Sequence, residues 1–235
     1  MLDPARLRQR TSLNGLPENR AGPEKNQTLQ VNSEKLILFL KAPRPGAVKT
    51  RLAEAIGTGP ACAAYLRCVE TLLIQLQSLR PVELCFSPAA AAAEIQAWLR
   101  PGWIAVPQAE GDLGQRLRSA FQRSFDAGAS RVVVIGSDCP AITADDIRNA
   151  WEALRTHDVV LGPANDGGYW LIGLRRIQPE LFGDIPWSTG NVFAETLKRS
   201  LRGNLSVQVL RELRDIDTES DWIAFLQGSQ CPPKP

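Results

Sequence analysis

The chain has 235 residues, of which 44% are hydrophobic and 22% charged, as expected for one soluble globular domain with a genuine core. Its formal net charge of +2 gives no electrostatic argument for nucleic acid as the main partner. The five cysteines are scattered and form no Cys-x-x-Cys pair, which favours reduced thiols over a disulfide framework or a zinc site. No apolar stretch is long enough to span a membrane, and the first residues lack the apolar core of a secretory signal. We therefore expect a cytoplasmic protein without a membrane span.

Both ends of the chain differ in composition from its middle. Residues 1–32 have few clustered apolar side chains and predict a disordered N-terminal tail, because such a segment buries too little surface to offset its ordering entropy. Residues 229–235, which end in Pro-Pro-Lys-Pro, predict a short C-terminal tail. The sequence thus predicts a single domain over residues 33–228.

Within this domain, strand-like and helix-like segments alternate. The hydrophobic pattern predicts strands at 36–40, 82–86, 104–106, 131–135, 158–161, 169–174 and 207–210. It predicts helices at 60–79, 89–99, 112–127, 143–154, 189–201 and 219–226. The alternation predicts an α/β fold with a mostly parallel sheet between layers of helices. The unbroken Val-Val-Val-Ile of the fourth strand is typical of a strand covered on both faces.

The first predicted strand ends in a proline- and glycine-containing loop that is rich in basic side chains. These are Lys41, Arg44, Lys49 and Arg51. Ligands of open α/β sheets bind at the carboxyl ends of the strands, where fixed cations suit a phosphorylated ligand. Gly46 would allow a backbone conformation in this loop that other residues resist. An ordinary P-loop is excluded, because Gly does not directly precede the Lys. The alternative is a rim of solvated cations.

Two acidic motifs follow later strands and are expected at the same edge of the sheet. Asp138 comes directly after the buried fourth strand, in Gly-Ser-Asp-Cys-Pro. Asp166 lies in Asn-Asp-Gly-Gly-Tyr, between two predicted strands. Two carboxylates opposite a cationic loop would suit Mg²⁺ or Mn²⁺ bound to a diphosphate. The alternatives are a helix cap for Asp138 and a simple hairpin turn for Asp166.

Together these motifs resemble the signatures of the DUF2064 group. They read Lys41-Ala-Pro-Arg-Pro-Gly-x-x-Lys49-Thr-Arg51-Leu, Gly136-Ser-Asp138-Cys-Pro140 and Asn165-Asp166-Gly-Gly-Tyr169. Members of the group are described as glycosyltransferases, some associated with arsenosugar biosynthesis. It belongs to the GT-A, or nucleotide-diphospho-sugar transferase, superfamily, which also holds molybdenum-cofactor and phospholactate guanylyltransferases. The resemblance covers roughly residues 35 to 226 and implies a Rossmann-like three-layer α/β/α sandwich.

The resemblance also implies roles for particular residues. Lys49 and Arg51 become phosphate-loop cations, Asp138 the metal-associated carboxylate and Asp166 the second acidic ligand of Mg²⁺ or Mn²⁺. Glycosyltransferases of this fold often have Asp-x-Asp, where this chain has Ser137-Asp138-Cys139. The implied reaction is transfer of a sugar from a nucleotide-diphospho-sugar to a small-molecule acceptor. The residues assign no general base, oligomeric state, nucleobase or sugar.

Several other residues have two possible interpretations, one as a ligand contact and one as a purely structural residue. Gly114 lies where a helix begins, which could receive an anion or a base edge, whereas Asp112 could simply cap that helix. Trp187 could stack on an acceptor or cover the core. Asp217 more plausibly caps the last helix than binds a ligand, and His157 is expected to be structural.

The resulting site hypothesis has three parts. The nucleotide- and phosphate-binding candidates are Lys41, Arg44, Gly46, Lys49, Arg51, Gly114 and Ser137. The metal candidates are Asp138 and Asp166, and the acceptor-side candidates are Gly168, Tyr169, Trp187 and Ser188. Two other functions stay open: a guanylyl- or cytidylyl-type nucleotidyltransferase that uses an NTP and a phosphorylated acceptor, and a non-catalytic nucleotide-binding module. The single carboxylate of Ser137-Asp138-Cys139 is the reason to consider a non-catalytic module.

Overall fold

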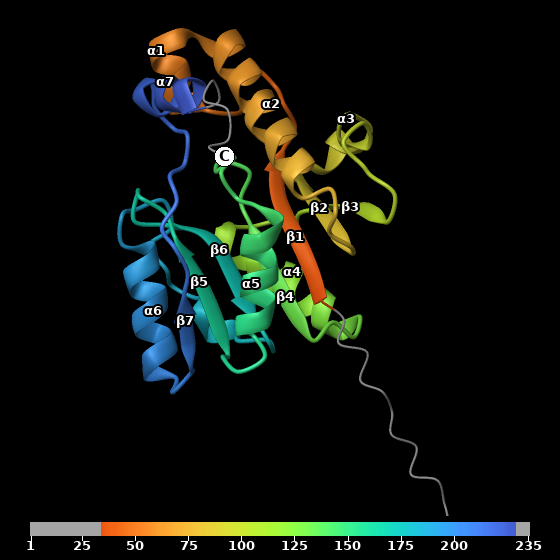
Figure 1. The fold of residues 1–235 in the computed structure, drawn as a ribbon, viewed down its shortest axis with the longest axis vertical. Helices are drawn as coiled ribbons and strands as arrows, with labels where there is room; N and C mark the ends of the chain where they lie inside the picture. Colours follow the sequence, from red (N-terminus) through yellow and green to blue (C-terminus); the bar gives the residue numbers. More distant parts are fainter. Residues whose placement is uncertain (1–33, 229–235) are drawn as a thin grey trace, which may run out of the picture. The chain divides into compact units, whose positions relative to one another are not determined.

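The computed structural model describes residues 34–228, so the tails predicted at 1–32 and 229–235 lie outside the described residues. Its strands form one seven-stranded sheet (Figure 1). They are β1 (Glu34–Lys41), β2 (Val82–Ser87), β3 (Trp103–Pro107), β4 (Arg131–Ile135), β5 (Val159–Pro163), β6 (Tyr169–Leu174) and β7 (Val207–Val209). The strands agree with the predicted ones to within a few residues.

The strand order of the sheet is β3-β2-β1-β4-β6-β5-β7. Pairing is parallel except around β6, which is antiparallel to both β4 and β5. The chain runs outward from β1 to β2 and β3, then returns to place β4 on the other side of β1. This reversal is a topological switch point, and the crevice at the carboxyl ends of β1 and β4 is where such sheets bind ligands.

Helices cover both faces of the sheet. They are α1 (Thr50–Ile56), α2 (Thr58–Gln75), α3 (Ala92–Gln96), α4 (Leu113–Asp126), α5 (Ala144–Ala153), α6 (Val192–Arg202) and α7 (Glu219–Gly228), with single 3₁₀ turns at Ala89–Ala91 and Pro179–Leu181. Along β1, successive side chains point to opposite faces. Leu36 and Leu38 pack with α2 and α5, whereas Ile37 packs with α4. A smaller cluster joins α1, α2 and α7 through Leu52, Ala61 and Trp222. The predicted three-layer GT-A sandwich is confirmed.

Several helix predictions need correction. The segment 50–56 was not predicted as a helix, because its seven residues are too few to show a clear period. The Ala-rich stretch at 89–99 has high helix propensity, yet it forms a 3₁₀ turn after Pro88 and only five α-helical residues. The helix predicted from residue 189 begins at Val192. No helix between residues 34 and 228 is long and apolar enough to cross a membrane.

Candidate active site

A cavity of about 920 Å³ lies at the switch point of the sheet. Its walls come from the loop after β1, the end of β4, the β5–β6 turn, the segment before α6 and the loop before α7. In this order, the five segments contribute Lys49, Asp138, Asp166, Trp187 and Asp217 to the cavity wall. The fold therefore brings the basic loop and both predicted acidic motifs to one place.

Lys49 forms the centre of the charged part of this cavity. It precedes α1 in the left-handed conformation (φ 48°), and its side chain is only 1% exposed. Its Nζ forms an ion pair with Asp138 Oδ1 and lies 3.5 Å from Asp217 Oδ1. Burial opposes the charge of Lys49, but the attraction of Asp138 and Asp217 outweighs it and raises the Lys49 pKa. Lys49 therefore remains an ammonium ion.

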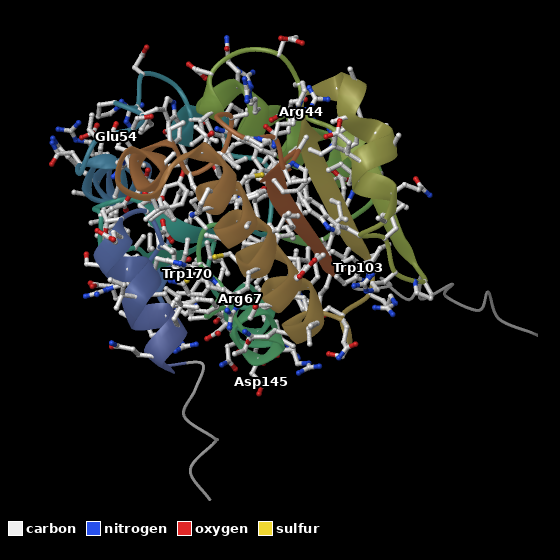
Figure 2. All side chains as sticks on the ribbon, turned by 90° about the horizontal axis from the view of Figure 1, so that it is seen from above. Arg44, Glu54, Arg67, Trp103, Asp145 and Trp170 are labelled. Carbon is white, nitrogen blue, oxygen red and sulfur yellow. The ribbon has the colours of Figure 1, made fainter. Side chains whose placement is uncertain are left out.

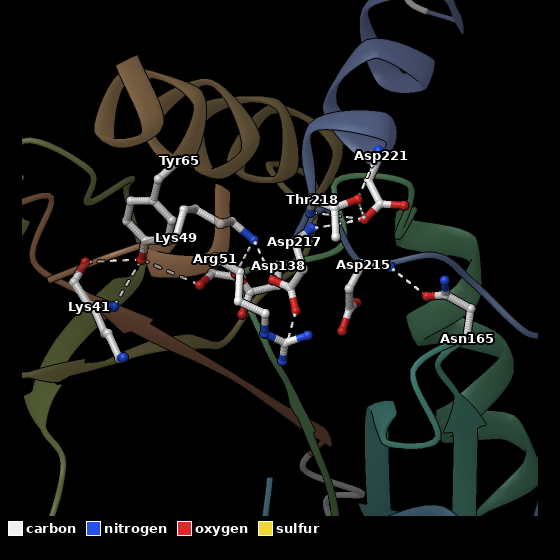
Figure 3. A network of polar contacts seen from close by, with 11 residues as sticks. Lys41, Lys49, Arg51, Tyr65, Asp138, Asn165, Asp215, Asp217, Thr218 and Asp221 are labelled. Carbon is white, nitrogen blue, oxygen red and sulfur yellow. Dashed lines mark hydrogen bonds and ion pairs between the residues drawn. The ribbon is translucent and has the colours of Figure 1, made fainter. Parts of the chain in front are cut away.

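Asp217 lines the cavity and does not cap α7, so the predicted cap is wrong. The cap is Thr218, whose Oγ1 accepts a hydrogen bond from the Asp221 N–H (3.3 Å), while Asp221 Oδ2 accepts one from the Thr218 N–H (3.0 Å). Asp217 instead faces Lys49 and Arg51, with 3.5 Å between Arg51 and Asp217 Oδ2 (Figure 3). Arg51 lines the cavity and is exposed, as a residue that meets a ligand must be.

Asp166 lies in the turn of the β5–β6 hairpin and also lines the cavity. Its Oδ1 accepts a hydrogen bond from the Gly168 N–H at 2.8 Å. Gly167 has a φ of +85° and its Cα faces the Gly190 backbone so closely that a side chain would collide with it. The hairpin alternative is therefore correct, and the same turn places the Asp166 carboxylate at the cavity, where its role as a metal ligand stays a prediction.

Asp215 is a cavity residue that sequence reasoning missed. Its backbone N–H donates to Asn165 Oδ1 (3.2 Å), which ties it to the hairpin turn. Burial and the nearby charges of Asp138, Asp166 and Asp217 raise its pKa to about 7. The available signal was an Asp-Ile-Asp triplet in the segment that follows β7, at the cavity edge of the sheet.

Tyr65 supports the opposite side of the network. Its hydroxyl accepts a hydrogen bond from the Lys41 N–H (2.9 Å), donates to the Lys41 carbonyl (3.0 Å) and lies 3.3 Å from Ser137 Oγ (Figure 3). Burial raises the Tyr65 pKa to about 12, so the phenol is neutral. Ser137 is therefore at the cavity wall as predicted, held between β1 and β4.

The charges at the acidic end of the cavity do not balance. Asp138, Asp166 and Asp217 give three formal negative charges, Asp215 adds a fourth only as the pH rises above its pKa of about 7, and Lys49 and Arg51 give two positive ones, which leaves between −1 and −2. Hard divalent cations prefer such oxygen ligands and share them with substrate phosphates. Between residues 34 and 228, no group of three or more His, Cys, Asp or Glu side chains is arranged to hold a metal ion by itself. The chemistry of the donor set fits a cation that is completed by substrate oxygens.

Three predicted nucleotide-binding residues do not line the cavity. Arg44, labelled in Figure 2, pairs with Glu94 at 2.5 Å. Gly46 has a φ of +82° and serves the turn of the basic loop. Gly114 packs against Trp187 and the Phe182 carbonyl, which leaves no room for a ligand. Asp112 caps α4 in a capping box with Gln115, as the structural alternative held.

The acceptor-side candidates Gly168, Tyr169, Trp187 and Ser188 all line the cavity. The Tyr169 hydroxyl, however, is buried beside Thr196 of α6, and burial raises the Tyr169 pKa. Only its ring can face a ligand. Trp187 both lines the cavity and packs on Gly114, so the two alternatives for Trp187 are compatible.

Gln108 and Arg116 also line the cavity, and neither was a predicted site residue. They begin and end the segment 108–116, whose two glycines lead into a helix start that could receive an anion or a base edge, but Gly114 alone was chosen from it as a site candidate. Cys139 lies beside Asp138, but burial raises its pKa to about 12, so it is a neutral thiol.

Comparison with solved structures supports the class that this fold and site define. The chain is similar to a candidate nucleotide-diphospho-sugar transferase from Desulfovibrio desulfuricans G20, with 34% identity, coverage of 85% of this chain and 89% of the other, and a TM-score of 0.79. It shares only its fold with 4-diphosphocytidyl-2C-methyl-D-erythritol synthase from Anaerococcus prevotii DSM 20548 (12% identity, 83% and 99% coverage, TM-score 0.54). The same holds for Rv0371c from Mycobacterium tuberculosis H37Rv (19% identity, 83% and 98% coverage, TM-score 0.53). The fold is that of nucleotide-diphospho-sugar transferases and nucleotidyltransferases.

Residues 71–189 match the model of the family described as "Uncharacterized protein conserved in bacteria (DUF2064)". The chain belongs to the DUF2064 family, which confirms the resemblance of its motifs. No curated protein matches the chain.

Proposed function

We propose that the protein is a metal-assisted glycosyltransferase that moves a sugar from a nucleotide-diphospho-sugar to a small acceptor. The observation that carries the proposal is the cluster of four carboxylates and two cations at the switch point of the sheet. The 34% identity to a candidate nucleotide-diphospho-sugar transferase supports the donor class. Transfer of a sugar requires a departing nucleoside diphosphate to be stabilised, and this cluster supplies the groups for that task.

Asp138 and Asp166 are the residues that would hold Mg²⁺ or Mn²⁺. Asp138 has a half-exposed side chain and Asp166 is exposed, so each can offer an oxygen to the cavity. The net negative charge of the acidic end supports this assignment, and a structure of Rv0371c, which shares the fold, is complexed with manganese. When bound, the ion would act as a Lewis acid on the diphosphate oxygens.

The chain's own residues would bind and orient the donor. Arg51 is exposed at the cavity and can turn from Asp217 towards a phosphate, where its planar fork can bond two oxygens. Lys49, held by Asp138, supplies a fixed buried charge beside the leaving group. The rings of Trp187 and Tyr169 form an apolar wall that would exclude water from the sugar.

The test is a binding and product panel. Nucleotide-diphospho-sugars with different bases, and the corresponding NTPs, are titrated with and without Mn²⁺, and the products are analysed for nucleoside diphosphate and pyrophosphate. We expect metal-dependent binding of a nucleotide sugar and release of nucleoside diphosphate. The variant Asp138→Asn should bind this donor at least about tenfold more weakly, because it loses a charged metal ligand.

Asp145→Asn is the matched control, because Asp145, labelled in Figure 2, is 83% exposed on α5 and does not line the cavity. It should bind donor as the wild type does. Donor binding that is equal in Asp138→Asn and the wild type would refute the site.

Nucleotidyl transfer is the second candidate, and one observation favours it. Lys41 and Arg116 line the cavity without an ion-pair partner in the described part of the chain, and two such cations would suit an additional phosphate. Pyrophosphate as product, formed from an NTP, would identify this reaction. Tight nucleotide binding that ignores metal and consumes no donor would instead indicate a non-catalytic module.

A further inference from the structure

The cavity has a second charged region, which the acidic cluster does not use. Lys41 and Arg116 line it, and neither forms an ion pair within residues 34–228. Arg44, Lys49 and Arg51, by contrast, each face a carboxylate. An uncompensated cation at a cavity wall is available to an anionic ligand at no cost of breaking an ion pair.

Arg116 is held in position by the protein. Its Nε donates to the Gly111 carbonyl at 2.8 Å, and one terminal nitrogen donates to Gln108 Oε1 at 3.3 Å. The Gly111 turn that offers this carbonyl has a φ of +103°, which favours glycine. Within residues 34–228, three of the five N–H donors of Arg116 have no hydrogen-bond partner, so its guanidinium is held in one orientation and can still donate to a ligand.

The support of Arg116 reaches into the sheet, to the residue that precedes Lys41. Gln108 Nε2 donates to the Cys85 carbonyl (2.9 Å) and to the Leu40 carbonyl (3.3 Å). Both polar atoms of the Gln108 amide group thus form hydrogen bonds within the protein. Gln108 therefore links the sheet to Arg116. Because Leu40 directly precedes Lys41, the hydrogen bonds of Gln108 place Arg116 beside the end of β1. Lys41 lies in Figure 3 at the opposite end of the network from Asp215 and Asn165.

We propose that Arg116 and Lys41 form a phosphate subsite that is separate from the metal-assisted acidic end. A preorganised guanidinium fork with a neighbouring ammonium fits a phosphate group, which offers several charged oxygens to both. This inference rests on the proposed function, since it gives the substrates of that cavity a second anionic group. The group is a phosphate of the acceptor or an additional phosphate of the donor.

The subsite can be tested without metal or nucleotide. Inorganic phosphate is titrated calorimetrically into the full chain in the presence of a chelator. Wild type should bind phosphate, and Arg116→Gln and Lys41→Gln should each bind it about tenfold more weakly, because each loses a charge-assisted contact. Arg118→Gln, an exposed position on the same helix and outside the cavity, is the control and should bind as wild type.

Two further titrations identify the source of the phosphate. If Arg116→Gln weakens binding of an NTP but not of a nucleotide sugar, the subsite takes a donor phosphate. If it weakens only binding of a sugar phosphate, the subsite takes an acceptor phosphate. The inference is overturned if wild type does not bind phosphate, if Arg116→Gln binds it like wild type, or if Arg118→Gln loses as much. Failure of the proposed function would appear separately, as absence of metal-dependent nucleotide-sugar binding.

Discussion

At the scale of one residue, Asp215 shows how burial and neighbouring carboxylates destabilise an ionised side chain. Its folded pKa of about 7 lies above the ordinary value of about 4 for an unfolded Asp. A raised folded pKa means that the stability linked to this group is fully present below the unfolded pKa and is lost as the pH rises through the folded pKa. The window of loss therefore runs from about pH 4 to about pH 7.

Asp215→Asn should remove this loss, because an amide does not ionise. In chelator, we expect the variant to be more stable than wild type by about 1–3 kcal/mol at pH 8 and nearly equal to it at pH 4. Denaturant unfolding across this pH range measures the difference. Asp145→Asn, at an exposed carboxylate, should show no such trend. A constant difference between Asp215→Asn and wild type at all pH values would contradict the assignment.

The site residues that the sequence revealed are those whose type and local motif carry the signal. Lys49, Asp138 and Asp166 follow strands or lie in glycine turns, and the switch point brings them together. Arg116 had a weaker signal, since it only ends a segment whose two glycines lead into a helix. Its orientation depends on Gln108, whose bonds to Leu40 and Cys85 cross 68 and 23 residues of sequence. Such long-range side-chain contacts follow from the tertiary fold and leave no local pattern.

At the scale of elements, two close approaches hold the segment that precedes α6 against the cavity. Gly167 faces the backbone of Gly190, and Gly114 of α4 faces the ring of Trp187. A Cβ at Gly114 would lie 2.8 Å from Trp187 Nε1 and closer still to the Phe182 carbonyl. Since one of these neighbours is backbone, the clash cannot be relieved by a side-chain rotation alone.

Gly114→Ala should therefore move the Trp187 segment and destabilise the protein by about 1–3 kcal/mol. Gly59→Ala offers a matched comparison, because Gly59 is likewise the second residue of its helix and a Cβ there meets nothing within 4 Å. That variant should be neutral or stabilised by up to about 1 kcal/mol. Thermal unfolding of both variants measures the contrast. Equal effects of the two substitutions would show that Trp187 is not held by this contact.

The elements also show why a sequence predicts a sheet better than its helix boundaries. Buried strands such as β4 have a strong and continuous apolar signal. The start of α6 and the short extent of α3 depend on loop contacts and on Pro88, which a period of apolar residues does not record. Within β2, Glu83 is 1% exposed and pairs with Lys35 at 2.7 Å and with Arg123. The hydrophobicity of the sequence could not predict that this charged side chain is buried in an apolar strand.

At the scale of the whole described domain, the burial of apolar side chains is uneven. Leu36, Ile37 and Leu38 of β1 are fully buried, whereas α7 contains no buried residue. Trp222 attaches α7 to the cluster of Leu52, Ala61 and Ala64. The guanidinium of Arg67 on α2 lies 5.9 Å from the centroid of the Trp222 ring. Elements with few buried contacts open at a lower free energy than the core.

Hydrogen exchange should accordingly show α7 opening before the sheet. Trp222→Ala should speed exchange of the α7 amides and leave β1 and β4 unchanged, because it removes the ring that packs on α1 and α2. Ile223→Ala, on the same helix but 46% exposed, should have little effect. Since Asp217 lies two residues before the start of α7, an opened helix would also release the carboxylate that faces Lys49 and Arg51. One common exchange rate for α7 and β1 would refute separate opening, and equal effects of both substitutions would refute the role of Trp222.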